Sequence, residues 1–464
     1  MLKIKTDSRK IVSGDTFVAI RGINSDGHQY IEQAIAKGAT NIVAEEGSYS
    51  VPTLIVPDTK LYLAQYLKDK TKEQLKDVKF IGITGTNGKT TTCYLIYKLL
   101  NMLRSNSAYI GTIGYYLNNE KFELNNTTPE IVDLYEMFVE SATQGAKNIV
   151  MEVSSHALEL GQVEGLTFDA AGYTNLTKEH LDFHQNMGNY LQAKQKLFKQ
   201  IKPNGFAVIN GDDEFANDFI MPHNTNYTVG EAENNTYQII DYQLDIDKTT
   251  FTFAYQSNNY QVTINLPGKY NIHNFMMALI TVQQMGYDIN DILDKAVVLE
   301  APPGRMDSIT YNDASIIVDY AHTPDAVLNV LTTAQACAQG KIYTIVGCGG
   351  NRDKTKRPIM GDIATKMSDY VIFTNDNPRF EDEKAIMADI TNGLAQSNYE
   401  VIYDRKKAIN KAISLLQPQD MLLILGKGHE KYQIVGDEHL IHDDKAVVED
   451  CIKKNTHSLN LTKI

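Results

Sequence analysis

From Val78 onward, short apolar runs alternate with longer stretches of helical periodicity. The runs KFIGIT, NIVMEVS, FDAAGYTNL and GFAVIN have the pattern of buried strands. Strands separated by helices are typical of a parallel, doubly wound sheet. The pattern changes at 236–266, where TTFTFAY and NYQVTINL flank a polar turn and predict antiparallel strands. A helix is expected to follow, from about Asn271 to Met285.

Two further α/β units flank this region. Residues 1–76 contain the strand-like runs DTFVAI and TLIVP, a helix YIEQAIAKGA ended by Gly38, and the polar, helix-like LKDKTKEQLKD. After the paired prolines at 302–303, alternation restarts with SIIVDYA, KIYTIVGCGG, DYVIFTND, EVIYD and DMLLILGKG. We therefore predict an α/β protein of three domains: a small N-terminal domain at 1–76, a central parallel-sheet domain at 77–301, and a Rossmann-like C-terminal domain at 302–464.

Composition limits the class of protein. A 43% hydrophobic and 22% charged chain is typical of a globular protein. Its longest apolar runs fall far short of the roughly 20 residues of a membrane span, and its first residues contain no run of signal-peptide length. Four scattered cysteines form no framework, which favours a reduced, cytoplasmic protein. The net charge, 44 − 57 = −13, disfavours nucleic-acid binding, so local donors must hold any phosphate ligand.

The stretch GITGTNGKTTT has the character of a phosphate-binding loop. It lies between the strand KFIGIT and the helix TTTCYLIYKLLNML, which we expect to be amphipathic. Gly85 and Gly88 permit a tight turn, Lys89 can reach the β and γ phosphates, and the Thr90 hydroxyl can ligate Mg²⁺. The usual pattern, G-x-x-x-x-G-K-[ST], would require a glycine where Ile83 stands. This departure disfavours a routine GTPase or ATPase switch, and the strand–turn–helix context disfavours a chance match.

Further candidate residues follow two of the predicted strands. Glu152 closes the apolar strand NIVMEVS, where a metal-ligating acid of a phosphate-loop enzyme is expected. His180, Asp182 and His184 cluster after the next strand, and Lys194 lies on the following helix. Taken singly, each has an ordinary structural interpretation, such as a solvated strand end, a packed histidine or a surface cation. For Glu152, the position after a phosphate loop and before SSH favours metal ligation.

Nine motifs, in one order over essentially the whole chain, resemble the Mur ligase family of cell-wall amino-acid ligases. They are GTNGKTT, MEVSSHAL, TNLTKEHLDFH, GKYNIHN, GRMD, VDYAHTPDA, GCGGNRDKTKRP, DNPR and GKGHEKYQ. The resemblance implies that ATP phosphorylates a carboxylate and that an incoming amine then displaces phosphate from the acyl phosphate. It also implies Mg²⁺, a uridine-nucleotide site in the N-terminal domain and a C-terminal domain that closes over ATP, with a hinge at APPGR.

Catalytic and nucleotide roles are carried over by the same resemblance. Lys89, Glu152, His180 and Lys194 are the implied catalytic residues. Thr90 and Glu152 would bind one Mg²⁺, with His180 at a second and Lys194 carbamylated by CO₂ to give an anionic oxygen ligand. The implied ATP-binding residues are Gly85, Thr86, Asn87, Gly88, Lys89, Thr90, Thr91, Asn271, His273, Asn274, Arg305 and Asp319.

The implied carboxylate substrate is UDP-MurNAc-L-Ala-D-Glu. Thr6, Ser8 and Asn24 are assigned to its uridine nucleotide, and Asn126, Thr127, Thr128 and Ser154 to its dipeptide. Turn and N-cap duties are the alternative for each of these residues. Gln162 stands where the family often has an arginine, so that any contact there would be neutral and weaker.

The motif DNPR implies that the added amino acid is meso-2,6-diaminopimelate. The distal end of diaminopimelate carries a carboxylate, to which Arg379 can donate two parallel hydrogen bonds. Arg352 can bind another carboxylate. Asp376 and Glu430 can accept from its ammonium group, and Asn377, Pro378 and Gly426 complete the expected site. Asn375, where an aspartate is common, is a minor departure.

Three alternatives remain open. The same ligase could add L-lysine, although an arginine would repel lysine's ammonium group. A folylpolyglutamate synthetase would share the fold and the acyl-phosphate route but lack the N-terminal domain and DNPR. A regulatory nucleotide switch would leave His180, Lys194 and Arg379 unexplained. We expect a monomer that binds neither nucleic acid nor membrane.

Overall fold

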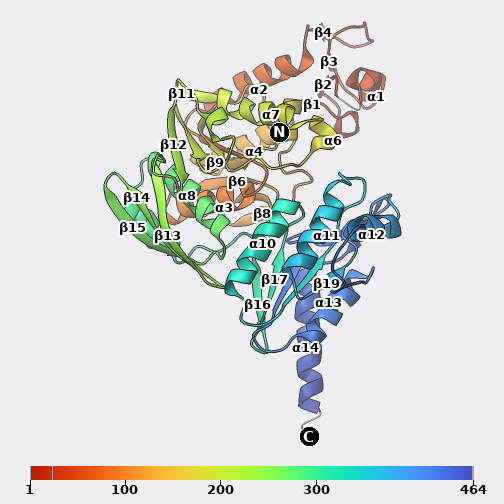
Figure 1. Ribbon diagram of the computed structural model, residues 1–464. Helices are drawn as coiled ribbons and strands as arrows, with labels where there is room; N and C mark the ends of the chain where they lie inside the picture. The colour runs from red at the N-terminus through yellow and green to blue at the C-terminus, as the bar shows by residue number, and fades with distance from the viewer. Residues whose placement is uncertain (1, 23–24, 462–464) are drawn as a thin grey trace.

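The computed structural model describes residues 2–22 and 25–461 (Figure 1). Its strands form three main sheets and one separate hairpin. The first sheet is parallel and contains β1 (Ile4–Lys5), β2 (Thr16–Val18), β3 (Asn41–Ala44) and β4 (Thr53–Ile55). Around it lie η1 (Ser8–Lys10), η2 (Gly27–Tyr30), α1 (Ile31–Ala36) and α2 (Thr59–Leu75). Asn24, one of the predicted uridine-site residues, lies outside the described residues.

An eleven-stranded sheet forms the central part, with the order β15-β14-β13-β12-β11-β10-β5-β9-β6-β7-β8. Its strands are β5 (Lys79–Thr84), β6 (Ser107–Gly111), β7 (Gly114–Leu117), β8 (Glu120–Phe122), β9 (Asn148–Glu152), β10 (Phe168–Tyr173), β11 (Ile201–Asn210), β12 (Thr225–Gly230), β13 (Tyr237–Leu244), β14 (Thr249–Tyr255) and β15 (Asn258–Ile264). The pairings from β13 through β12, β11, β10, β5 and β9 to β6 are parallel. Both outer ends are antiparallel, so the change of strand pattern predicted within 236–266 is confirmed.

Helices cover the central sheet. They are α3 (Lys89–Met102), α4 (Ile131–Thr143), α5 (Ser155–Leu160), α6 (Leu181–His184), α7 (Met187–Lys199), η3 (Ala216–Phe219), α8 (Lys269–Gln284) and α9 (Ile289–Ala296). The expectation that α3 is amphipathic is wrong, because nearly every residue from Thr90 to Leu100 is buried. The helix lies between the sheet and α8, and a helix enclosed in this way has no solvent face.

The third sheet is six-stranded, with the order β16-β17-β21-β18-β19-β20. It contains β16 (Asp307–Tyr311), β17 (Ala314–Asp319), β18 (Ile342–Val346), β19 (Tyr370–Phe373), β20 (Tyr399–Val401) and β21 (Met421–Leu425), and the separate hairpin is β22 (Tyr432–Val435) with β23 (Glu438–Ile441). Its helices are α10 (Pro324–Cys337), α11 (Lys356–Met367), α12 (Glu383–Thr391), α13 (Arg405–Leu415) and α14 (Asp444–Leu461). The end of α14 extends away from the rest of the chain (Figure 1). The three predicted α/β units are confirmed, while their limits at 76/77 and 301/302 stay predictions.

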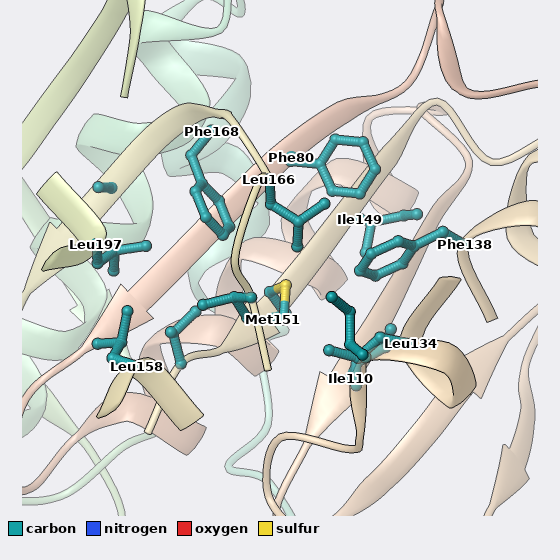
Figure 2. Close-up of a cluster of buried hydrophobic side chains, with 14 of the residues drawn as sticks. Phe80, Ile110, Leu134, Phe138, Ile149, Met151, Leu158, Leu166, Phe168 and Leu197 are labelled. Atoms are coloured by element: carbon teal, nitrogen blue, oxygen red, sulfur yellow. The ribbon is translucent and has the colours of Figure 1, made fainter. Parts of the chain in front are cut away.

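The central sheet has a hydrophobic core on each face. On one face, Phe80, Phe138 and Phe168 pack with Ile149 and Met151 of β9, as Figure 2 shows. The other face packs against α3 and α8. With both faces covered, parallel strands such as β5 and β9 carry apolar residues on each side and end in polar residues at one edge of the sheet. That edge holds Thr84 and Glu152, and the phosphate-loop sequence begins directly after it.

Candidate active site

The loop from Gly85 to Gly88 makes its turn in a conformation that favours glycine. Gly85 has φ of +146° and Gly88 has φ of +86°. A Cβ at Gly85 would lie 1.8 Å from Oγ1 of Thr174, and one at Gly88 would lie 2.4 Å from Oδ1 of Asn274. Both positions therefore combine a left-handed backbone with close neighbours, and α3 begins immediately behind them with its free N–H groups.

Two lysines converge on the loop. Lys89 Nζ donates to the carbonyls of Gly85 and Thr86, each at 2.9 Å, and Lys194 Nζ donates to the same Gly85 carbonyl at 2.7 Å. The Lys194 residue is only 1% exposed, and its Nζ lies 4.4 Å from the ring centroid of Tyr190. Burial, together with the charge of Lys89, holds the pKa of Lys194 well below its usual value. Burial also lowers the pKa of Lys89. The lowered pKa of Lys194 favours its neutral amine form.

Glu152 is a fully buried carboxylate at the end of β9. Its Oε2 accepts from the Thr90 hydroxyl at 2.9 Å and from the Thr112 hydroxyl at 3.1 Å. Its Oε1 accepts from Tyr109 Oη at 2.6 Å and from the Thr112 amide at 2.8 Å. These donors are all neutral, and among the described residues no cation lies within ion-pair distance of this carboxylate. A buried acid solvated only by neutral donors is suited to receive a cation with its ligand.

His180 belongs to a cluster of rings beside Lys194. Its backbone is left-handed, with φ of +57°, and its ring centroid lies 4.8 Å from that of His156. The Nε2 atom of His184 lies 3.0 Å from Ser155 Oγ, and the ring centroid of His184 lies 5.5 Å from that of His156. Burial lowers the pKa of His180 to about 2 and that of His184 to about 4, so both imidazoles are neutral near pH 7. Within the described part of the chain, no group of three or more His, Cys, Asp or Glu is placed to hold a metal ion alone.

A cavity of about 380 Å³ lies between the phosphate loop and the third sheet. The predicted nucleotide residues that line it are Asn87, Gly88, Thr91, Asn271, His273, Asn274, Arg305 and Asp319. Asn274 donates to Asn271 at 3.0 Å and accepts from the Thr92 hydroxyl at 3.3 Å, so these amides are fixed by α3 and α8. Lys89, Thr90, Glu152, His180 and Lys194 lie beyond the lining, around the loop itself.

Arg305, the last residue of the stretch APPGR, connects the central part with the third sheet. Arg305 donates to the Thr90 hydroxyl at 3.3 Å, and its guanidinium lies 4.6 Å from the ring centroid of Tyr320. Asp319 accepts from the backbone amides of Met306 and Ala321, each at 2.7 Å, and thereby fixes the turn that carries Arg305. The carboxylate of Asp319 is therefore already satisfied by backbone donors.

Two further contacts across this boundary were not anticipated from the sequence. Asn87 Nδ2 donates to Oδ2 of Asp325 at the start of α10, at 2.8 Å. Lys356 at the start of α11 pairs with Glu179 at 3.2 Å, and both side chains are about nine-tenths buried. Glu179 directly precedes His180 in the chain, so the third domain contacts the histidine cluster at this point. Such long-range pairs leave no local signal in the sequence.

The predicted dipeptide residues lie next to Glu152. Thr127 Oγ1 lies 3.0 Å from the Thr112 hydroxyl, and Thr128 donates to the Glu152 carbonyl at 2.9 Å. Ser154 is the N-cap of α5 and accepts from the Ala157 amide at 3.1 Å, while Asn126 is exposed. Gln162 uses its amide nitrogen to hydrogen-bond Glu130 at 2.9 Å. In the first domain, Ser8 donates to Gln33 at 2.8 Å, and Thr6 is partly exposed.

The residues predicted for the amino acid gather after β19 and β21. Arg379 has a left-handed backbone, with φ of +53°, and its Nη1 donates to the carbonyl of Gly350 at 3.0 Å. Its other side-chain nitrogens make no hydrogen bond within the described residues. Burial and the charge of Arg352 lower the pKa of Arg379, with Asp376 and Glu430 acting in the opposite direction. Oδ2 of Asp376 is buried without a partner in the described structure, beside Gly426. Pro378 precedes Arg379, and the side chain of Asn377 contacts Glu430.

A strand–loop–helix arrangement lies beside a cavity whose other wall comes from the third α/β unit. Together with the separate polar site in that unit, this arrangement defines a phosphate-loop α/β protein. Three family models match the chain: "Mur ligase family, catalytic domain" over 3–70, "Mur ligase middle domain" over 83–282, and "Mur ligase, glutamate ligase domain" over 304–428. The chain belongs to the Mur ligase family, as its motifs predicted.

Individual relatives agree with this assignment. The chain is 40% identical over 458 residues to the UDP-N-acetylmuramoyl-L-alanyl-D-glutamate--2,6-diaminopimelate ligase of Bacillus cereus, covering 97% of this chain and 93% of that one. It is 39% identical over 462 residues to the ligase of the same name from Fusobacterium nucleatum, covering 96% and 92%. A solved structure of a ligase of that name is 32% identical, with a TM-score of 0.72, and covers 98% of this chain and 95% of that one. A folylpolyglutamate synthase of Mycobacterium tuberculosis, 15% identical with a TM-score of 0.67, covers 79% of this chain and 92% of that one and shares the fold alone.

Proposed function

We propose that this chain is an ATP-dependent ligase that joins meso-2,6-diaminopimelate to UDP-N-acetylmuramoyl-L-alanyl-D-glutamate in cytoplasmic peptidoglycan precursor synthesis. The relatives at 39–40% identity that carry this name support the proposal. The observation that carries it is the site around Arg379, whose Nη1 is held by the carbonyl of Gly350 and whose pKa responds to the charges of Arg352, Asp376 and Glu430, with Oδ2 of Asp376 left without a partner in the described structure. A side chain that ends in both a carboxylate and an ammonium group complements that arrangement, whereas lysine offers only the ammonium group.

The reaction begins with phosphoryl transfer. The terminal carboxylate of the dipeptide attacks the γ-phosphorus of ATP, and ADP leaves with the bonding electron pair. Lys89 and the N-terminus of α3 would bind the phosphates. The dipeptide would lie beside them, held by Thr127, Thr128 and Ser154. The amine of diaminopimelate then attacks the carbonyl carbon of the acyl phosphate. Phosphate leaves with the carbon–oxygen bonding electrons, and the nitrogen releases a proton.

The residues at the loop fit the implied Mg²⁺. Thr90 and Glu152 would hold it together with phosphate oxygens, since magnesium sites in proteins often use one or two carboxylates plus substrate phosphates. When bound, Mg²⁺ neutralises charge on the transferring phosphoryl group. Neutral His180 could serve a second ion through its imidazole.

The surroundings of Lys194 fit a carbamate. Only a neutral amine adds CO₂, and the lowered pKa of Lys194 favours that form. The neighbouring positive charge of Lys89 would stabilise the anionic carbamate on Lys194. The carbamate would then offer an oxygen ligand to a hard cation. We include carbamylation of Lys194 in the proposed function.

ADP release by the purified protein tests this function. Turnover should require ATP, Mg²⁺, the UDP-linked dipeptide and an amino acid, and omission of any one should abolish it. ATP hydrolysis at the same rate without the dipeptide would instead support a nucleotide switch. Arg379→Ala should impair the use of diaminopimelate far more than ATP binding, and an equal loss of both would contradict the role given to Arg379.

A further inference from the structure

Lys427 is a fully buried lysine with no role among those given above. It follows β21 between two glycines, Gly426 and Gly428, whose φ angles are +114° and +51°. A Cβ at Gly426 would lie 2.6 Å from Oδ2 of Asp376, and one at Gly428 would lie 2.6 Å from the carbonyl of Gly304. The glycines therefore allow the backbone to pass close to the site predicted for the added amino acid, called the acceptor site below, and they place the lysine inside the protein.

The ammonium group of Lys427 has two hydrogen-bond partners, both predicted residues of the acceptor site, and it lies 5.8 Å from the ring centroid of Tyr432. Its Nζ donates to Oδ1 of Asn377 at 2.9 Å and to Oε2 of Glu430 at 2.8 Å. Nδ2 of Asn377 donates to the same Oε2 at 3.0 Å, so that the three side chains form a closed triangle. Oδ1 of Asn377 also accepts from the Ile434 amide at 3.0 Å, which fixes the orientation of the amide.

This triangle restricts how the two acceptor residues can move. A buried ammonium group without partners costs several kcal/mol, so neither Asn377 nor Glu430 can rotate away without a large penalty. Oε2 of Glu430 accepts the hydrogen bonds from both Lys427 and Asn377, whereas Oε1 accepts none within the described residues. The carboxylate therefore keeps one oxygen for an incoming ammonium group, in a direction that Lys427 determines.

We propose that Lys427 is a positioning residue of the acceptor site, which fixes Asn377 and Glu430 so that the distal end of the amino acid meets a preformed set of donors and acceptors. This inference rests on the proposed function, because it takes the DNPR segment as the acceptor site. Lys427 acts through its neighbours and is not among the described residues that line the nucleotide cavity.

The test is a comparison of KM values in the full-length enzyme. Lys427→Met should raise the KM for diaminopimelate by about 10–100-fold, by analogy with the loss seen when groups that orient metal ligands are removed. The KM values for ATP and for the UDP-linked dipeptide should stay within about twofold. Lys427→Gln retains hydrogen-bond donors and should give an intermediate KM for diaminopimelate. If Lys427→Met does not fold, Lys427→Gln provides the test in its place. Lys366→Met, which removes an exposed lysine paired with Asp362 at 2.7 Å, is the matched control.

The double variant Lys427→Met/Glu430→Gln separates positioning from stability. It removes both charges and should recover thermal stability relative to Lys427→Met, without recovery of the acceptor KM. An acceptor KM that stays at the wild-type value, or a rise shared equally by all three substrates, would overturn the proposal. If the wild-type enzyme uses lysine instead of diaminopimelate, the proposed function fails, and the same KM comparison with lysine still decides the role of Lys427.

Discussion

The hydroxyl of Thr90 donates a hydrogen bond to Glu152 at 2.9 Å and so links the first turn of α3 to the end of β9. These two residues belong to neighbouring elements at one edge of the central sheet, because β5, which leads into α3, pairs directly with β9. Glu152→Gln keeps the size of the side chain but removes the charge that Mg²⁺ requires. We expect at least about a 100-fold loss of kcat, with a higher Mg²⁺ concentration for half-maximal activity. A titration of Mg²⁺ against ADP release measures both effects.

Glu159→Gln provides the control for Glu152, because Glu159 is a half-exposed carboxylate on α5 paired with Lys196. It should leave the Mg²⁺ dependence unchanged. An unaltered Mg²⁺ requirement in Glu152→Gln would remove Glu152 from the metal site.

Lys194 should be active only as a carbamate. Lys194→Ala should lose nearly all turnover, and short carboxylates such as formate or acetate should restore part of it by entering the vacated space. Rigorous removal of CO₂ and bicarbonate should lower wild-type activity reversibly, and ¹³C NMR with labelled bicarbonate should detect the carbamate. Lys196→Ala, two residues along the same helix, should behave as wild type. Full activity of a protein shown to carry unmodified Lys194 would contradict this prediction.

The Glu179–Lys356 pair should stabilise the contact between the central domain and the third domain. Glu179→Gln or Lys356→Met alone leaves a buried partner charge unpaired, so each should raise the KM for ATP by about tenfold and expand the molecule in X-ray scattering. The double variant should recover part of the loss, with a coupling energy of about 0.5–3 kcal/mol. Strictly additive effects would show that the pair does not couple the two domains.

The buried pair Arg405–Asp444 should contribute to the stability of the third domain. Asp444 is fully buried and accepts two hydrogen bonds from Arg405, at 2.7 and 2.8 Å. Burial alone would raise the pKa of Asp444, but Arg405 and His442 outweigh it and hold that pKa below its usual value. The contribution is therefore complete above the unfolded pKa of about 3.9 and is lost as pH falls from there through the lower folded pKa. Asp444→Asn should cost about 3–5 kcal/mol at pH 7 in urea unfolding. The difference from wild type should shrink at acidic pH, and a pH-independent difference would contradict the assignment.

Local sequence rules predicted the phosphate loop and the ends of the strands. Gly85 and Gly88 have the left-handed conformations that a tight loop requires, and Glu152 is the last residue of β9. Both features depend on a few consecutive residues, so a single sequence reveals them. The burial of α3 was misjudged because α8, nearly 180 residues further along the chain, covers the face that the periodicity left to solvent.

Residues that depend on tertiary contacts could not be predicted in the same way. Thr112 donates to Glu152 from another strand connection, and Asp325 reaches Asn87 across the boundary between domains. Lys427 occupies a motif that was noted, yet its burial and its two partners depend on the approach of the DNPR segment. Neither hydrophobic pattern nor spacing specifies such approaches. The roles given to Thr6, Ser8, Asn126 and Gln162 stay predictions.

The identity of the added amino acid is the central claim, and a competition experiment tests it most directly. The purified enzyme is given ATP, Mg²⁺, the UDP-linked dipeptide and equal concentrations of meso-diaminopimelate and L-lysine, and the products are separated by mass spectrometry. Because Arg379 and Arg352 suit a distal carboxylate, we predict that the diaminopimelate product predominates and that Arg379→Ala reduces this preference. A predominance of the lysine product in the wild-type enzyme would contradict the account.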